Sequence, residues 1–447
     1  MVQNILINMS EATPCLQEAF SKNKNVKILS FAIILLILFP YIGSLPLTLL
    51  FLALTLTSKT VLSKVIGEYY YLFLAITILF VIDLISQQLE YSFPDYIIIQ
   101  SLEISSIGLM VAKTIRENGN LNRNHHSLPS SICLLLAGGI VAAIAGGWSL
   151  YCNGESGYEI MLFTAIIGAI MAALFESIPS EFDKMLSMTL GSAMAMWVLV
   201  SFGYSISPLH LLFAFIFSLS FGYLAYITKI ADISAVMSST LMGVLIIVFS
   251  NILWYVLLLT FFILGGMFTR YRYEYKLSKG LAQEKGGIRS YENVFSNSTA
   301  ALAFAIAYGI YPQHAELISY AYLGTVATAT ADTLASEIGT TAKQTPRMIT
   351  NLKPTKSGTD GAITVLGEMA AIGGACVIAI LATVFGMTEN IYYAIIFTCV
   401  GGFVGTNIDS LLGGTLQKRG YLSNSGVNFY ATLAGGLFSG LAYLLIA

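Results

Sequence analysis

Long apolar segments separated by short polar loops recur along almost the whole chain. The segments fall near 27–41, 45–62, 69–88, 95–113, 131–150, 159–176, 185–205, 208–227, 233–249, 251–269, 299–311, 315–338, 361–387, 390–412 and 428–446. Because about 20 apolar residues form a helix long enough to cross a bilayer, the pattern predicts an all-α polytopic membrane protein with about fifteen transmembrane helices. Composition agrees, since 56% of the residues are hydrophobic and only 10% are charged.

The basic residues occur in every second loop. Lys and Arg precede the first apolar segment and follow the even-numbered segments, whereas the alternate loops carry acids without Lys or Arg. Cytoplasmic loops are enriched in Lys and Arg, so the pattern places the N-terminus in the cytoplasm and the C-terminus outside the cell membrane. Residues 1–26 lack the features of a cleaved signal peptide and are expected to form a cytoplasmic cap.

Charge and cysteine usage exclude several function classes. The formal net charge of -2 provides no field for binding nucleic acid. The five Cys are scattered and form no Cys-x-x-Cys motif, which argues against a disulfide framework or a zinc knuckle. The adjacent pair His125 and His126 lies in a polar loop without further ligand-type spacing, so we interpret it as solvated.

The N-terminal membrane module, residues 27–205, carries few chemical motifs. An intramembrane acid suggests function by default, yet Asp83 fits a polar contact equally well. Residues 176–184 resemble a signature of the phytol and dolichol kinases, with Lys184 where that family has Asn. The resemblance implies a polyprenol-kinase-like module that has lost its catalytic residues. The alternative is a charged helix end that stops at Pro179.

The C-terminal module, residues 206–447, contains the motifs, and the first of them is the acidic segment 331–339. Asp332 and Glu337 end a long run of Ala, Thr and Gly. Five residues apart, they diverge by about 140° on a regular helix, so they would share an ion only where the helix ends or unwinds. Helix packing explains the small residues but not the acids, for which we predict hard-cation binding.

A further acid, Asp409, enters the cytoplasmic end of a later apolar segment. It follows Gly405, Thr406 and Asn407, so its surroundings are small and polar. Lys418 and Arg419 come soon after, so a simple ion pair with these cations is the alternative to metal binding.

A basic loop between the acidic segments ends in the turn Ser357–Gly361. Thr359 or Asp360 is expected to be the N-cap of the following helix, which would leave backbone N–H groups free for an anion. Gly358 and Gly361 would let the backbone approach a ligand closely. The turn therefore predicts a phosphate-binding element beside the acids.

Polar residues also precede two of the apolar segments. Asn297 and Ser298 are expected to cap the segment that follows them, unless Asn297 and Arg289 hold a phosphate or a base. Asn424 and Asn428 flank the start of the last segment, where they either cap it or contact substrate.

These segments, in this order, resemble an integral-membrane family that includes plant phytyl-phosphate kinase and human transmembrane protein nineteen. The resemblance covers roughly 225–447 and depends on 289–297, 331–339, 358–361, 409–413 and 424–428. Leu334 and Asn293 depart from the usual Trp and Gln of that family, which bears on substrate choice more than on the reaction. The resemblance implies phosphoryl transfer from a nucleoside triphosphate, with CTP favoured, to an isoprenyl monophosphate lipid.

The resemblance also implies roles for individual residues. One or two Mg²⁺ ions would be held by the catalytic acids Asp332, Glu337 and Asp409. The nucleotide and its phosphates would be bound by Arg289, Asn297, Lys343, Arg347, Lys353, Lys356, Gly358, Thr359, Asp360 and Gly361. The lipid substrate would be bound by Thr328, Thr333, Ser336, Asn424 and Asn428. Such a set supplies the positioning and charge neutralisation on which phosphoryl transfer depends.

Two other functions stay open on the residues alone. A cytidylyltransferase-like lipid enzyme would use the same kind of site but would release pyrophosphate. A secondary transporter would place its polar site near the bilayer midplane, whereas these acids lie at the cytoplasmic ends of apolar segments. The expected partners are the membrane and an isoprenyl-phosphate lipid, without nucleic acid, and the sequence leaves the oligomeric state open.

Overall fold

A computed structural model of the chain describes residues 37–42, 44–59, 70–88, 93–118, 128–178, 183–204 and 206–446. Four features discussed above lie wholly or mostly outside these residues. They are the expected cap 1–26, most of the apolar segment 27–41, the pair His125 and His126, and Pro179.

The described residues are almost entirely helical, and they divide into two compact units, Met1–Pro208 and Leu209–Ala447. The elements of the first unit are η1 (Phe39–Tyr41), α2 (Ser44–Lys59), α4 (Tyr70–Gln88), α5 (Asp95–Glu103), the π-helical η3 (Ile104–Gly108), α6 (Leu109–Asn118), α7 (Leu128–Asn153), α8 (Tyr158–Ser177) and α9 (Lys184–Val200).

The second unit begins with α10, which starts at the boundary. Its elements are α10 (Pro208–Ile227), α11 (Ile233–Phe249), α12 (Ile252–Arg270), α13 (Tyr273–Ser278), η4 (Glu284–Gly287), α14 (Tyr291–Ile310), η5 (Pro312–His314), α15 (Ala315–Gly339), β1 (Arg347–Met348), β2 (Ala362–Ile363), α16 (Val365–Val384), α17 (Ile391–Leu412), the π-helical η6 (Gly413–Gln417) and α18 (Asn424–Ile446). The strands form one short antiparallel hairpin in the loop between α15 and α16.

Nine helical stretches of the described residues are long and apolar enough to cross a membrane, or up to ten if the bent pair α14 and α15 is one span. Three shorter apolar helices accompany them, at Leu45–Thr57, Lys184–Val200 and Ile233–Phe249. Every apolar segment after the first contains a helix, although the segment 361–387 begins with β2 and becomes helical only at Val365. The protein is thus an all-α polytopic membrane protein. Fewer spans qualify than the about fifteen expected, because several helices are short or polar.

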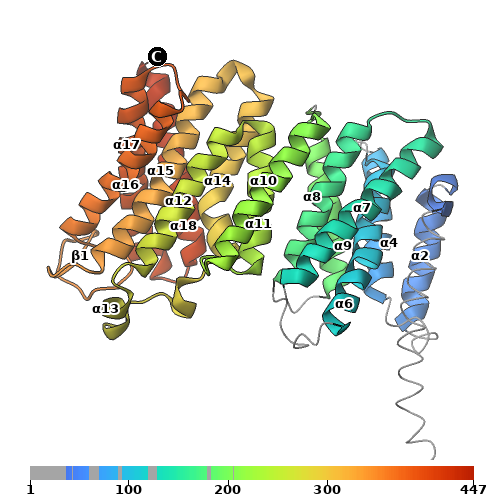
Figure 1. Ribbon diagram of the computed structural model, residues 1–447, viewed down its shortest axis with the longest axis horizontal. Helices are drawn as coiled ribbons and strands as arrows, with labels where there is room; N and C mark the ends of the chain where they lie inside the picture. Colours follow the sequence, from blue (N-terminus) through green and yellow to red (C-terminus); the bar gives the residue numbers. More distant parts are fainter. Residues whose placement is uncertain are drawn as a thin grey trace, which may run out of the picture. The chain divides into compact units, whose positions relative to one another are not determined.

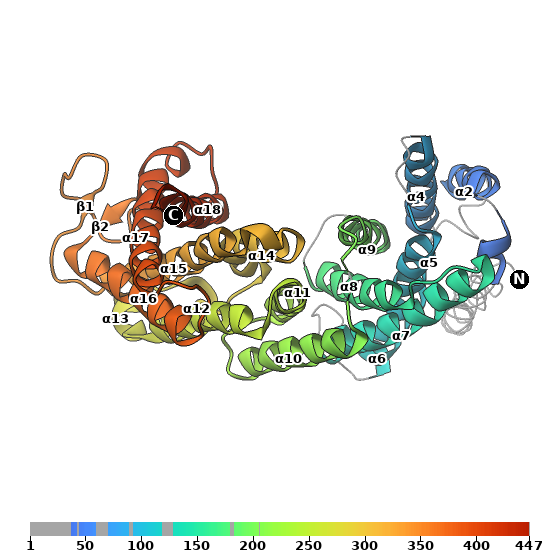
Figure 2. The same cartoon turned by 90° about the horizontal axis from the view of Figure 1, so that it is seen from above.

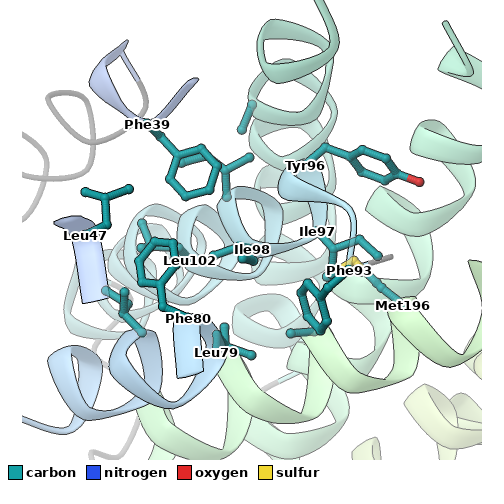
Figure 3. Close-up of a cluster of buried hydrophobic side chains, with 14 of the residues drawn as sticks. Phe39, Leu47, Leu79, Phe80, Phe93, Tyr96, Ile97, Ile98, Leu102 and Met196 are labelled. Carbon is teal, nitrogen blue, oxygen red and sulfur yellow. The ribbon is translucent and has the colours of Figure 1, made fainter. Parts of the chain in front are cut away.

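The first unit is held together by a cluster of buried hydrophobic side chains from η1, α2, α4, α5, α7, α8 and α9. Figure 3 shows Phe39 and Phe80 gathered on one side of this cluster and Phe93 and Met196 on another. The rings of Phe39 and Phe80 stack, with their centroids 5.9 Å apart.

Helix α8 of the first unit ends at Ser177, and Lys184 contacts its last turn. The Nζ atom of Lys184 donates hydrogen bonds to the carbonyl oxygens of Phe175 and Glu176, at 2.9 and 3.0 Å. A cation that satisfies the last carbonyls of a helix is a common way to end it.

The core of the second unit is α15, which packs against α12, α14, α16, α17 and α18 (Figure 2). Every side chain from Ile318 to Ala331 is buried. Small residues allow this close packing. The buried hydroxyl of Thr328, for example, donates to the carbonyl oxygens of Gly324 and Gly401, on α15 and α17.

The helices of the second unit alternate in direction, which gathers its basic loops at one end. Figure 1 shows α13 and β1 at this end, which we call the basic end, and the C-terminus at the opposite end. The loop after α10, the segment between α12 and α14, the β-hairpin loop and the turn before α18 all lie there. Alternate loops of this unit therefore share one side, as the charge pattern requires.

Candidate functional site

A polar cavity of about 330 Å³ lies at the basic end of the second unit. It is formed by α14, α15, α16, α17, the start of α18 and the β-hairpin loop. Twelve of the residues that the sequence singled out line it: Arg289, Asn297, Asp332, Thr333, Ser336, Gly358, Thr359, Asp360, Gly361, Asp409, Asn424 and Asn428. Residues from segments more than a hundred positions apart are thus brought to one place.

Two carboxyl groups meet in this cavity, one from Asp332 on α15 and one from Asp409 on α17. Their side chains lie close enough to influence each other's charge, and Asp360 lies close enough to add its negative charge. The Oδ2 atom of Asp409 is buried and has no hydrogen-bond partner. Adjacent carboxylates repel unless a proton or a cation lies between them. The donor set therefore fits a hard cation.

No basic side chain of the described residues forms an ion pair with either acid. Lys418 and Arg419, the alternative partners of Asp409, are both exposed. The helix end that carries Asp409 continues instead into the π-helical turn η6, a feature often found at functional sites.

Glu337 lies outside this pair. Because α15 is helical to Gly339, the five-residue spacing turns Glu337 away from Asp332, as the sequence argument required. Its Oε2 atom lies 2.5 Å from the Nζ atom of Lys276, and its Oε1 atom accepts hydrogen bonds from Gln283 at 2.6 Å and from Thr269 at 3.1 Å. Among the described residues, no group of three or more His, Cys, Asp or Glu is arranged to hold a metal.

The ion pair between Lys276 and Glu337 is fully enclosed, with the side chains 1% and 6% exposed. The Nζ atom of Lys276 also donates to the carbonyl oxygens of Phe268 and Thr269, at 3.1 and 2.7 Å. The pair therefore fastens the short helix α13 to the ends of α12 and α15. We regard Glu337 as a residue that shapes the cavity wall and does not itself reach the acid pair.

Arg289 provides a buried cation at the cavity wall. Its guanidinium group lies over the rings of Phe261 and Phe262, 5.1 and 5.8 Å from their centroids. It passes so close to Gly265 that a β-carbon there would overlap it. Burial lowers the pKa of Arg289 to about 10, and the negative charge of Glu337 opposes this shift. The group is thus still protonated at neutral pH.

The turn Ser357–Gly361 lines the cavity, but it does not start a helix. Helix α16 begins at Val365, and its N-cap is Thr364, whose Oγ1 atom accepts a hydrogen bond from the Gly367 N–H at 3.0 Å. The prediction that Thr359 or Asp360 is the N-cap is therefore wrong. The chain after the turn pairs instead as β2 with β1, and Gly361 has a φ of +77°, which lies outside the right-handed helical region.

Gly361 is required by close packing. A β-carbon at this position would lie 2.5 Å from the Cα atom of Gly414 and 2.6 Å from the carbonyl oxygen of Ser410. These atoms belong to the segment that carries Asp409. The contact therefore holds the turn against the acid pair.

We expect Gly361→Ala to reduce substrate turnover at least about tenfold, because the turn must move away from the segment that carries Asp409. The fold should survive, since the change lies in a loop. Gly420→Ala is the matched control, because Gly420 has a φ of +76° but nothing within 4 Å of its β-position. Both variants carry a similar strain, so equal turnover in the two would contradict this role of Gly361.

Six of the predicted residues do not line the cavity. Glu337 and Thr328 are buried elsewhere, as described above. The other four are exposed residues of the loop between α15 and α16: Lys343, Arg347, Lys353 and Lys356. Arg347 donates its Nη1 hydrogen to the carbonyl oxygen of Leu352.

The prediction that Asn297 caps its helix is also wrong. Helix α14 begins at Tyr291, with a capping box formed by Ser290 and Asn293. Asn297 lies one turn further in, where its Nδ2 atom donates to the Asn293 carbonyl at 3.0 Å. Both Asn side chains line the cavity.

Several cavity residues were not assigned to the site from the sequence. They are Gln283, Asn293, Thr340, Glu368, Thr406, Ser410 and Gln417. Their signal is helical spacing: Asn293 and Asn297 are one turn apart, and polar residues recur along one side of α17 and η6. Glu368 is further held by the Nδ2 atom of Asn407, at 3.2 Å.

Comparisons with known proteins agree on the second unit. The chain matches the family described as integral membrane protein DUF92 over residues 216–436. It is 34% identical to an uncharacterized membrane protein of Methanocaldococcus jannaschii over 217 residues, which are 48% of this chain and 87% of that protein. It is 34% identical to an uncharacterized membrane protein of Synechocystis over 195 residues, 42% of this chain and 74% of that protein.

A plant relative is more distant. Protein PGR of Arabidopsis thaliana is 26% identical over 281 residues, which cover 53% of this chain and 97% of that protein. No solved structure matches the chain.

Proposed function

The chain belongs to the integral membrane protein family DUF92, and from its polar cavity we propose that it is an isoprenyl-phosphate kinase. The enzyme transfers the terminal phosphoryl group of a nucleoside triphosphate, with CTP favoured, to an isoprenyl monophosphate. The products are an isoprenyl diphosphate and a nucleoside diphosphate. Phytyl and geranylgeranyl phosphates are the substrates of this class that we would test.

One observation carries the proposal: the contact between Asp332 and Asp409 inside a polar cavity, where Oδ2 of Asp409 has no partner. Mg²⁺ is typically held by one or two carboxylates together with substrate phosphates, so two acids are enough. Asp332 and Asp409 would hold the ion, with Asp360 adding charge. When bound, Mg²⁺ supplies neutralisation and orientation of the phosphate oxygens.

The remaining cavity residues would position the two substrates. Arg289 offers a fixed positive charge to a phosphate oxygen, and its stacking on Phe261 and Phe262 keeps it from swinging away. The side chains of Asn293 and Asn297 lie along the same wall. The Nδ2 atom of Asn297 already donates to the Asn293 carbonyl and to Ser296, so its Oδ1 atom is the group left for a substrate. Because the acceptor phosphate is already anionic, the reaction does not depend on a strong general base.

The cavity shares the basic end of the unit with the exposed cations of the loop between α15 and α16. Loops rich in Lys and Arg face the cytoplasm in membrane proteins, where nucleoside triphosphates are found. We therefore place the cavity at the cytoplasmic face, with the N-terminus inside and the C-terminus outside. Lys343, Lys353 and Lys356 would attract the nucleotide without holding its reacting phosphate.

The decisive experiment supplies the purified full chain with Mg²⁺, each nucleoside triphosphate in turn, and geranylgeranyl phosphate. We expect geranylgeranyl diphosphate and a nucleoside diphosphate, and no reaction when Mg²⁺ is chelated. Release of pyrophosphate with a nucleotide-linked lipid would replace the kinase by a cytidylyltransferase. Uptake of a solute into proteoliposomes without nucleotide, together with no lipid product, would replace it by a transporter.

A further inference from the structure

A second, narrow cavity of about 40 Å³ lies between α10, α11 and α12. We call it the apolar crevice. Its walls are almost wholly hydrocarbon, and at one end they include Arg289. The same Arg289 lines the polar cavity that holds the acid pair.

The crevice exists because small residues from neighbouring helices face one another. Gly222 and Ala225 come from α10, and Ala235 and Ser239, which are one turn apart, come from α11. Large side chains at these positions would close the gap. The sequence therefore leaves a narrow gap of about 40 Å³ beside the packed side chains of Ala231, Ala235 and Val294.

The third wall is one face of α12. Tyr255, Leu259 and Phe262 line the crevice at spacings of four and three residues, which places them on the same side of the helix. Seven residues of helix extend about 10 Å, so the crevice is a long slot and not a round pocket. Its shape and apolar walls suit an extended hydrocarbon chain.

Arg289 determines the direction in which an amphipathic ligand would lie in the slot. Its guanidinium group stacks on Phe261 and Phe262 and also reaches the polar cavity, so it stands at the junction of the two spaces. A molecule with an anionic head and an apolar tail would satisfy both. Beyond the slot, the outer side of α10 exposes Tyr223 and Leu224, at 45% and 53%, so a longer chain can continue into the bilayer.

We propose that the apolar crevice holds the first part of the hydrocarbon chain of the phosphorylated lipid, whose phosphate lies beyond Arg289 in the polar cavity. This inference rests on the proposed function for the identity of the lipid. It adds where the lipid enters, between α10 and α12, and which residue separates its head from its tail. The hydrocarbon tail of the lipid thus leaves the polar cavity on the side of α10 and not between α16 and α17.

A photoreactive lipid tests this placement directly. The full chain is mixed with geranylgeranyl monophosphate that carries a diazirine on its first isoprene unit, is irradiated, and is digested for peptide mapping. We expect adducts on peptides of α10, α11 or α12 that excess geranylgeranyl phosphate prevents. Adducts confined to α16, α17 or α18 would overturn the proposal.

Two variants give an independent measurement. Ala225→Phe should fill the slot and weaken binding of geranylgeranyl phosphate at least about tenfold, while binding of dimethylallyl phosphate changes little, because the loss comes from hydrocarbon contacts. Ile216→Phe is the control and should bind both lipids normally, because Ile216 is 55% exposed on the same helix and does not line the crevice. If Ala225→Phe unfolds, Ser239→Leu fills the slot from α11. Full affinity of the slot-filling variant that folds would also overturn the proposal.

The outcomes separate this inference from the proposed function. Adducts in the crevice without phosphoryl transfer would support the tail site and contradict the proposed kinase activity. Transfer with adducts elsewhere would retain the kinase and remove the tail site.

Discussion

Replacing Asp409 with Asn is expected to abolish phosphoryl transfer while raising the melting temperature of the protein. Activity should fall roughly a thousandfold or more, since the site loses half of the charge that would hold the cation at the transferring phosphate. Stability should rise because the buried, unpartnered Oδ2 atom becomes an amide that can donate to Asp332, and the contact between two acids disappears. The measurements are kcat with Mg²⁺ and thermal unfolding in detergent.

Asp332→Asn should behave in the same way, because the two acids form one unit. Glu292→Gln is the matched control: Glu292 is an exposed acid at the same end of the second unit, near the start of α14, but it does not line the cavity. A purely structural role for the pair would lower the melting temperature together with the activity. Normal turnover in both Asn variants would exclude the acid pair from the reaction.

Replacing Lys276 with Met is expected to destabilise the second unit by about 3–5 kcal/mol, since it leaves the carboxylate of Glu337 buried without its cation. The Lys276 side chain is 1% exposed and its Nζ atom is bonded to Glu337 and to two carbonyl oxygens. Lys279→Met is the control, because Lys279 is an exposed residue just after the same short helix. The measurement is the free energy of unfolding by denaturant in detergent.

The double variant Lys276→Met with Glu337→Gln should recover most of this loss. A neutral Gln side chain removes the buried charge and can still hydrogen-bond with Thr269 and Gln283. If the double variant is no more stable than Lys276→Met alone, the damage comes from lost packing and not from the unpaired acid.

The sequence predicted much of the fold. Apolar length alone located the long helices of the described residues but not the short helix α13. The alternation of basic loops anticipated that these loops gather on one side of the second unit. It also predicted that Asp332 and Glu337 could not share an ion on a regular helix. The sequence did not show whether the helix stays regular between Asp332 and Glu337. An unwound helix end would have allowed the two acids to share an ion.

The partners of the acids were harder to predict. Lys276 lies 61 positions before Glu337 and belongs to a short helix that the sequence presented only as a polar loop. The cations of the loop after α15 looked equally suited to a site, yet the hairpin of β1 and β2 leaves them exposed. Spacing along a chain identifies neighbours within a helix, but contacts between distant segments depend on tertiary packing.

The turn Ser357–Gly361 illustrates the same limit. A Gly-rich turn before an apolar segment is typical of a helix start, and local preference alone favours Thr359 or Asp360 as the N-cap. Here the pairing of Ala362 with Met348 and the contact of Gly361 with Gly414 outweigh that preference. Neither contact can be predicted from the residues next to the turn.

The uninterrupted course of α15 restricts how this protein can move. Asp332 and Glu337 belong to the same continuous helix. A rotation of α15 large enough to separate Asp332 from Asp409 would therefore also break the ion pair between Glu337 and Lys276. Breaking this buried ion pair costs free energy, which opposes rotation of α15 within the second unit. Any motion that changes the shape of the cavity is then expected in the β-hairpin loop, up to the point where Gly361 packs against the segment of Asp409.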